Sequence, residues 1–252
     1  MTALLALLEK ELTEQWRSRQ LPVVGVIFLL VGLGSPVLAR YTPEIIKAAA
    51  GPLNIPVPVP TLRDAVAQLV KNLGQVGVLT AILLAMGSIA REKENGTAAF
   101  LMTKPVSRGA FLLAKFSGLA MTIVSAVGLS GAAAYLYTSL LFSPPPALGL
   151  GIACGVIALG LLEIAAVTFL ASSVVGSPIA AAGLGVMAVV VTGLLAAIPE
   201  VARYTPFGLN KLASDLALQQ VGSGWGWPLL ANAAYVLVAL GASWLVFRRQ
   251  EL

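Results

Sequence analysis

REKENGTAAFLMTKPVSR, residues 91–108, is a long polar interruption between two apolar segments of the chain. It opens with four charged residues, Arg91 to Glu94, which predict the end of a hydrophobic helix. Asn95-Gly96 follows, and this pair favours the left-handed backbone conformation that closes a helix C-terminus. One long helix is therefore expected to end at the start of this stretch.

The second half of the same stretch predicts a short helix and then the start of another long one. Thr97 can cap a helix over residues 98–102, and Pro105 predicts its end because proline lacks a backbone N–H donor. Ser107 is placed to cap a long helix that begins near Gly109. We therefore interpret residues 91–108 as a compact helical elbow between two membrane spans.

Composition places the whole chain in a membrane. Of its 252 residues, 58% are hydrophobic and 11% are charged, whereas a soluble domain has about 25% charged residues. The net charge of +5 fits Lys and Arg side chains that face anionic lipid better than a surface that binds nucleic acid. An all-α, polytopic membrane protein is expected, with residues 1–252 forming a single transmembrane domain.

Several enzyme classes are excluded by missing residue types. The chain has no histidine and one cysteine, Cys154, which excludes Ser-His hydrolases, His-based zinc sites and a disulfide framework. Its two aspartates, Asp64 and Asp215, lie in polar connections, which disfavours a paired-Asp intramembrane protease. The chain has no GxxxxGK[ST] phosphate loop. We expect no catalytic residue, no metal site and no cofactor in this chain.

Six apolar segments are long enough to cross a hydrocarbon core of about 30 Å as helices. Before them, Leu5, Leu8, Leu12 and Trp16 share one face of a helix over residues 3–19, which predicts a helix lying in the membrane interface. The alternative is an amphipathic helix that packs on the protein itself. The predicted spans cover about 21–39, 73–90, 111–137, 148–171, 179–198 and 229–247.

Two connections carry further structure. Residues 41–60 are polar and then proline-rich, so 54–60 favours an extended strap, after which Thr61 can cap a helix that continues into the second span. In residues 199–228, apolar positions recur at helical spacing, and Trp225 and Trp227 suit the interface. We expect one or two short re-entrant helices there; a helix lying flat on the outer surface remains the alternative.

Charge distribution predicts the orientation. With six spans both termini lie on one side, and more Lys and Arg fall on the side of the termini and the elbow than on the other side. The termini and the elbow are therefore expected to be cytoplasmic. The residues on that side are Lys10, Arg17, Arg19, Arg91, Lys93, Lys104, Arg108, Lys115, Arg248 and Arg249, against Arg40, Lys47, Arg63, Lys71, Arg203 and Lys211.

Glu163 is an ionisable residue in the middle of a predicted span. A charge at the bilayer centre is unfavourable, so such a carboxylate is a candidate functional residue. The structural alternative is a glutamate that holds helices together through hydrogen bonds to Thr168, Ser172 or a hydroxyl on another helix. No basic residue accompanies it in the span. Both readings stay open.

The elbow and its surroundings resemble the membrane subunit of ABC-2 type ATP-binding-cassette transporters. The resemblance covers essentially the whole chain. It rests on an N-terminal helix with Lys10-Glu11-Leu12, on six spans, and on an elbow that reads E-K-E-x-G-T and then K-P-V-S-R. The matching positions in and after the elbow are Glu92, Glu94, Gly96, Thr97, Lys104, Pro105, Ser107, Arg108 and Lys115.

The resemblance implies a permease that works with a separate nucleotide-binding subunit, which holds ATP and Mg and into which the elbow docks. It also implies a second permease chain, in a homo- or heterodimer, within the cytoplasmic membrane of a prokaryote. Phe100 and Leu101 would anchor the contact with the ATPase, unless they lie in the headgroup layer. The candidate coupling residues are Arg91, Glu92, Glu94, Gly96, Thr97, Phe100, Leu101, Lys104, Pro105 and Arg108.

We therefore expect a permease subunit of an ATP-driven exporter. The alternative from another class is an ion- or proton-coupled secondary carrier that uses Glu163, and a third reading is a membrane scaffold without transport. The spans contain no recognisable constellation for a substrate.

Overall fold

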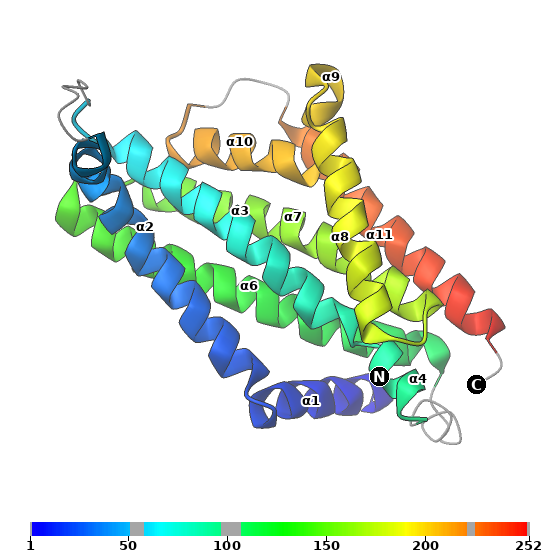
Figure 1. Cartoon of the computed structure of the whole chain (residues 1–252). Helices are drawn as coiled ribbons and strands as arrows, with labels where there is room; N and C mark the ends of the chain where they lie inside the picture. The colour runs from blue at the N-terminus through cyan, green and yellow to red at the C-terminus, as the bar shows by residue number, and fades with distance from the viewer. Residues whose placement is uncertain (1, 51–57, 97–106, 221–224, 251–252) are drawn as a thin grey trace.

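The computed structural model describes residues 2–50, 58–96, 107–220 and 225–250, and every regular element in these ranges is an α-helix. Figure 1 shows their arrangement. The helices are α1 (Thr2–Arg17), α2 (Gln20–Ala50), α3 (Leu62–Met86), α4 (Ala90–Glu94), α6 (Arg108–Leu141), α7 (Ala147–Val174), α8 (Pro178–Leu195), α9 (Pro199–Ala202), α10 (Pro206–Ala217) and α11 (Gly226–Arg249).

Six of these helices are long and apolar enough to cross a membrane: α2, α3, α6, α7, α8 and α11. The predicted all-α fold with six spans is confirmed. α7 lies in the middle of the bundle and packs against α3, α6, α8, α10 and α11. Small residues such as Gly160, Ala165 and Ala166 on α7 let neighbouring backbones approach closely, which is how helices associate in lipid.

The predicted caps form at the starts of α3 and α6. Asp64 accepts hydrogen bonds from the backbone N–H of Thr61, at 2.8 Å, and from its hydroxyl, at 2.7 Å. Ser107 Oγ accepts from the backbone N–H of Ala110 at 3.2 Å. These bonds satisfy donors at or near the N-termini, where the N–H groups lack carbonyl partners in the helix ladder.

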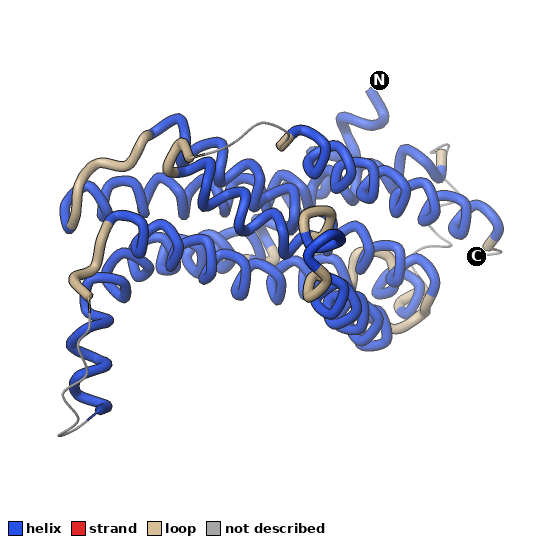
Figure 2. The backbone as a smooth tube through the Cα atoms, turned by 90° about the horizontal axis from the view of Figure 1, so that it is seen from above, coloured by secondary structure: helices blue, strands red, loops and turns tan. Residues whose placement is uncertain are grey.

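The first span is longer than predicted. We expected a helix over 21–39 and a polar connection from residue 41, but α2 continues to Ala50 despite Pro36 and Pro43. Residues 44–50, EIIKAAA, are mainly helix formers, and the length of a helix is not limited by the hydrocarbon that it crosses. Its last turns are mostly exposed and project away from the bundle (Figure 2). The predicted strap over 54–60 lies largely outside the described residues.

The connection before the last span contains two short helices, α9 and α10. α10 packs along α7 and α3 and buries Leu209, Ala213 and Leu216. Arg63 at the start of α3 donates a hydrogen bond to Gln220 just after α10. The predicted short helices are present; that they re-enter the membrane stays a prediction.

The start of α1, the helix α4 and the end of α11 lie at one end of the bundle (Figure 1), which we call the elbow end. α1 meets α2 at Arg19, whose positive φ of 61° lies in the bend between the two helices (Figure 1). α9, α10 and the last turns of α2 lie away from the elbow end. The elbow end therefore brings together three of the chain's charged segments.

Candidate functional site

The helix that enters the elbow is broken at Gly87 and Ser88. The second span was predicted to run to Ala90, but α3 ends at Met86 and a turn precedes α4. Ser172 on α7 stabilises this turn: its hydroxyl accepts from the backbone N–H groups of Ile89, at 3.1 Å, and Ala90, at 2.9 Å. The same hydroxyl donates to the carbonyl of Met86 at 2.9 Å.

This turn has a direct physical cause. Backbone groups that are buried without a partner are destabilising by about 1–3 kcal/mol each, so a helix break inside a bundle needs polar partners. Ile89 and Ala90 are fully buried, and Ser172 Oγ supplies the partner that water would supply at a surface. α7 therefore fixes the place where the elbow leaves the bundle.

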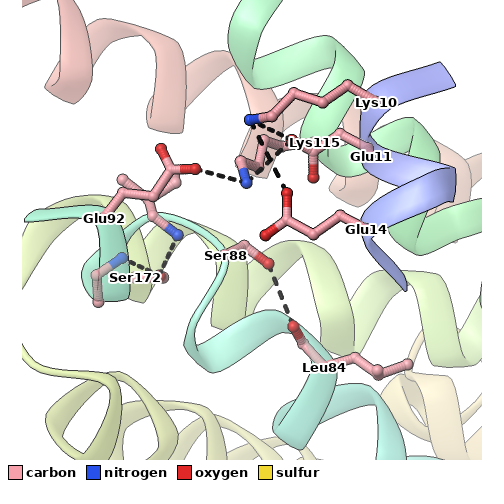
Figure 3. A network of polar contacts seen from close by, with 10 residues as sticks. Lys10, Glu11, Glu14, Leu84, Ser88, Glu92, Lys115 and Ser172 are labelled. Atoms are coloured by element: carbon pink, nitrogen blue, oxygen red, sulfur yellow. Dashed lines mark hydrogen bonds and ion pairs between the residues drawn. The ribbon is translucent and has the colours of Figure 1, made fainter. Parts of the chain in front are cut away.

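Lys115 on α6 is the centre of a buried ionic cluster (Figure 3). Its Nζ lies 2.7 Å from Glu92 Oε1 on α4 and 3.0 Å from Glu11 Oε1 on α1. The side chains of Lys115 and Glu11 are each 9% exposed, and that of Glu92 is 15% exposed. One cation thus joins the elbow and the N-terminal helix to the third span. We call Glu11, Glu92 and Lys115 the lysine cluster.

Charged side chains next to the lysine cluster are more exposed than its members. Lys10 lies 4.0 Å from Glu11 and 3.9 Å from Glu14, and the side chains of Lys10 and Glu14 are exposed. A cavity of about 150 Å³ separates α1 from the end of α3 and is lined by polar side chains that include Glu14, Gln15 and Arg91. A cavity needs only about 10–15 Å³ to hold one water molecule, so this one has room for several. Part of the contact between α1 and the elbow can therefore be hydrated.

α1 also lies close to α6 beyond the lysine cluster. Thr122 on α6 hydrogen-bonds Gln15 on α1, and a Cβ added at Gly118 would lie 3.3 Å from Glu11 Cβ. The absence of a side chain at Gly118 is what permits this approach. α1 therefore packs on the protein around Glu11 and Gln15. The alternative to an interfacial helix expected this packing.

The elbow end is further connected through main-chain carbonyls. Lys93 on α4 and Gln250 after α11 both donate to the carbonyl of Ser173, at 2.5 and 3.0 Å. Arg108 at the start of α6 donates to the carbonyls of Phe247, Arg248 and Gln250, at 2.8–3.0 Å. The last carbonyls of a helix lack partners within the helix, so Arg108 caps α11.

The candidate coupling residues separate into inward-facing and outward-facing ones. Glu92 and Arg108 are bound to the bundle, whereas Arg91 and Glu94 are exposed. Gly96 has the predicted positive φ, 68°. The remaining candidates lie outside the described residues: Thr97, Phe100, Leu101, Lys104 and Pro105.

Glu163 occupies a separate place, in the middle of α7. It is 6% exposed, and its Oε2 has no hydrogen-bond partner among the described residues. It lines a cavity of about 20 Å³ together with Gly185 and Thr192 of α8 and Pro206 at the start of α10. The space is enough for one water molecule. The partners that the structural reading suggested, Thr168 and Ser172, instead bond to main-chain groups.

The sequence did not predict two residues of the elbow end as site residues: Glu11 and Ser172. Glu11 belongs to the Lys10-Glu11-Leu12 segment, but its sequence position does not show that it meets Lys115. Ser172 was considered only as a partner of Glu163. Both act through contacts between residues that are far apart in the chain.

A bundle of six apolar helices with an amphipathic N-terminal helix and a charged elbow is the fold of a multi-pass membrane protein. The family described as "ABC-2 family transporter protein" matches residues 5–218, and the chain belongs to this family. It is therefore a membrane permease subunit of an ABC transporter, as the resemblance predicted.

Three relatives are similar to this chain, and two of them carry names that agree with this assignment. Over 261 residues the chain is 26% identical to the "uncharacterized transmembrane protein YxlG" of Bacillus subtilis (strain 168), covering 100% of this chain and 99% of YxlG. It is 33% identical to the "probable ABC transporter permease protein NosY" of Pseudomonas aeruginosa, over 49% of this chain and 42% of NosY. The NosY of Stutzerimonas stutzeri is 32% identical over 52% of this chain and 44% of that protein.

Proposed function

We propose that this permease is part of an ATP-driven exporter, in which its elbow docks on a separate ATPase subunit and a second permease chain completes the transport path. ATP and Mg belong to the ATPase subunit. The observation that carries the proposal is the lysine cluster, because it binds the elbow to α1 and α6 through buried charges. A force applied to the elbow would reach both helices.

The two faces of α4 differ in a way that supports docking on one side and force transmission on the other. Arg91 and Glu94 are exposed and can meet a soluble partner, whereas Glu92 is held by Lys115. A rotation of the docked ATPase would thus move α4 with α1 and α6 as one body, and the break before α4 would bend. Rigid-body motions of this kind switch transporters between states.

The elbow end is proposed to face the cytoplasm. The described residues there include Lys10, Arg91, Lys93, Arg108 and Arg248, and Lys and Arg are enriched on the cytoplasmic side of membrane proteins. In the cytoplasmic membrane of a prokaryote this orientation puts both chain ends on the side where ATP is available.

A copurification experiment tests the proposal. The tagged full chain is purified in mild detergent, and its partners and bound small molecules are identified by mass spectrometry. We expect a phosphate-loop ATPase and a second permease chain. In inside-out vesicles, an exporter gives ATP-dependent accumulation of any small molecule that copurifies.

A secondary carrier is the second candidate. The observation that favours it is Glu163 Oε2, which has no hydrogen-bond partner in the part of the chain that the structure describes. In that case the purified chain alone would move substrate in response to an ion gradient, without nucleotide. That result would contradict the ATP-driven proposal.

A further inference from the structure

An apolar cavity of about 300 Å³ lies near the elbow end, between the first turns of α6 and the second half of α11. α6 contributes Leu112 and Leu113, α11 contributes Leu240, Gly241 and Trp244, and Phe169 of α7 forms its floor. Phe169 is fully buried, whereas Leu113 is 54% and Trp244 40% exposed. The cavity therefore opens sideways, toward the hydrocarbon of the membrane.

Glycines keep this cavity open. A Cβ added at Gly241 would meet nothing within 4 Å, and one added at Gly109 would lie 3.4 Å from Trp244 Nε1. Gly109 therefore makes room for the indole ring of Trp244, and Gly241 leaves space beside it. The volume is at the lower end of the range of ligand pockets, about 300–1,000 Å³.

Two arginines lie next to residues that line the cavity. The guanidinium of Arg248 lies over the Trp244 ring, 5.3 Å from its centroid, and Arg108 adds a second guanidinium at the end of α11. Residues 226–250 contain Arg248 and Arg249 and no carboxylate. An aromatic side chain with a neighbouring arginine is typical of the level of lipid headgroups.

We propose that this cavity binds one anionic phospholipid, with an acyl chain between α6 and α11 and its phosphate beside Arg248. Basic side chains next to a gap between spans bind anionic headgroups in this manner. The site is distinct from the lysine cluster and from Glu163. It gives the permease a preference for anionic lipid beside α11, the helix whose end Arg108 joins to the start of α6.

Quenching of Trp244 fluorescence by brominated lipid tests the site. The full chain carries four tryptophans, so Trp16, Trp225 and Trp227 are replaced by Phe. The single-tryptophan protein is reconstituted in phosphatidylcholine vesicles that contain increasing fractions of dibrominated phosphatidylglycerol or dibrominated phosphatidylcholine. One basic residue near the surface favours anionic lipid by about fivefold, so half-maximal quenching is expected at about a fivefold lower fraction of the phosphatidylglycerol.

Two pairs of variants isolate the headgroup and the chain. Arg248→Gln is expected to abolish the preference, whereas Arg249→Gln, with the same loss of charge, keeps it. Gly241→Leu fills the cavity and is expected to reduce quenching by both lipids. Gly128→Leu is its control, since a Cβ at Gly128 on α6 also meets nothing within 4 Å.

The proposal is wrong if the two brominated lipids quench Trp244 equally, or if Arg248→Gln and Arg249→Gln have the same effect. It is also wrong if neither lipid quenches Trp244, which would show that another segment or a second copy of the chain covers the cavity. Elution of each variant at the wild-type volume in size-exclusion chromatography shows that it has folded.

Discussion

Two buried glutamates show how differently this molecule treats charge at its elbow end and in its middle. Glu92 is held by Lys115 at 2.7 Å, and the same ammonium holds Glu11. Glu163 lines a cavity for one water molecule, and its Oε2 has no hydrogen-bond partner among the described residues. The first glutamate joins three helices through ion pairs, and the second lies where α7, α8 and α10 meet.

The difference indicates where rigidity is built. A buried ion pair is strongly destabilised when one partner is lost, so the helices that share the lysine cluster resist separation. Within the described residues Glu163 forms no ion pair of this kind. We infer that the elbow, α1 and α6 form one mechanical unit, whereas the helices around Glu163 can separate more easily.

Removal of the central cation is expected to have the largest effect. Lys115→Met leaves the carboxylates of Glu11 and Glu92 buried together without their ammonium, which is destabilising by about 3–5 kcal/mol. Thermal unfolding of the detergent-solubilised protein measures this loss. Lys71→Met removes an exposed lysine and is the control. Equal melting of the two variants would show that the lysine cluster is not a restraint.

The turn before α4 is expected to be the next most sensitive feature. Ser172→Ala leaves the N–H groups of Ile89 and Ala90 and the carbonyl of Met86 without their shared partner, at about 1–3 kcal/mol per unsatisfied group. Ser173→Ala is the matched control, because the Ser173 hydroxyl donates to the carbonyl of Leu170 in its own helix. Faster hydrogen exchange at 89 and 90 is expected in Ser172→Ala alone; unchanged exchange there would contradict this role.

A smaller and local effect is expected at Gly96. Its φ of 68° costs a β-branched residue about 1–3 kcal/mol, and a Cβ there would meet nothing within 4 Å. Gly96→Val should therefore insert normally but bind the ATPase less well. Gly96→Asn, which tolerates this conformation, should bind like wild type. If valine and asparagine behave alike in a pull-down, the turn does not orient the elbow.

The smallest effect is expected at Glu163. Glu163→Gln keeps the shape of the side chain and adds N–H donors. A water molecule in the small cavity or a main-chain carbonyl can accept from them, so stability should change by less than about 1 kcal/mol. Transport should be retained. Assembly with normal ATPase binding but without transport would instead assign Glu163 a proton or cation role, and would revive the carrier hypothesis.

The sequence predicts the parts of this fold that depend on local patterns. The length of the apolar segments locates the six spans. Thr61 and Ser107 lie at the predicted helix starts, and Gly96 has the predicted positive φ. The end of α3 at Met86 was not predictable in this way, because Ser172 on another helix stabilises it. The continuation of α2 to Ala50 was not predicted, because residues 41–60 are polar and proline-rich as a whole although EIIKAAA within them favours a helix.

The candidate site also contains some features that depend on local sequence patterns and others that depend on packing. Glu92 and Lys115 are both visible as parts of the elbow motif, but their pairing with each other and with Glu11 depends on how three helices pack. Ion pairs between distant residues leave no periodic signal in a single sequence. The outward face of the elbow can be predicted better, since Arg91 and Glu94 are exposed as charged residues at a helix end usually are.

The central claim, that the elbow docks on an ATPase, is tested most directly by charge reversal at the two ends of the bundle. Glu94→Lys reverses an exposed charge on α4, and Glu200→Lys makes the same change on α9, away from the elbow end. Copurification of the ATPase is compared with wild type at low and at high salt. Glu94→Lys should weaken binding about fivefold at low salt and less at high salt, because salt screens exposed charges. Glu200→Lys should bind like wild type; equal binding by both variants at both salt concentrations would contradict docking at the elbow.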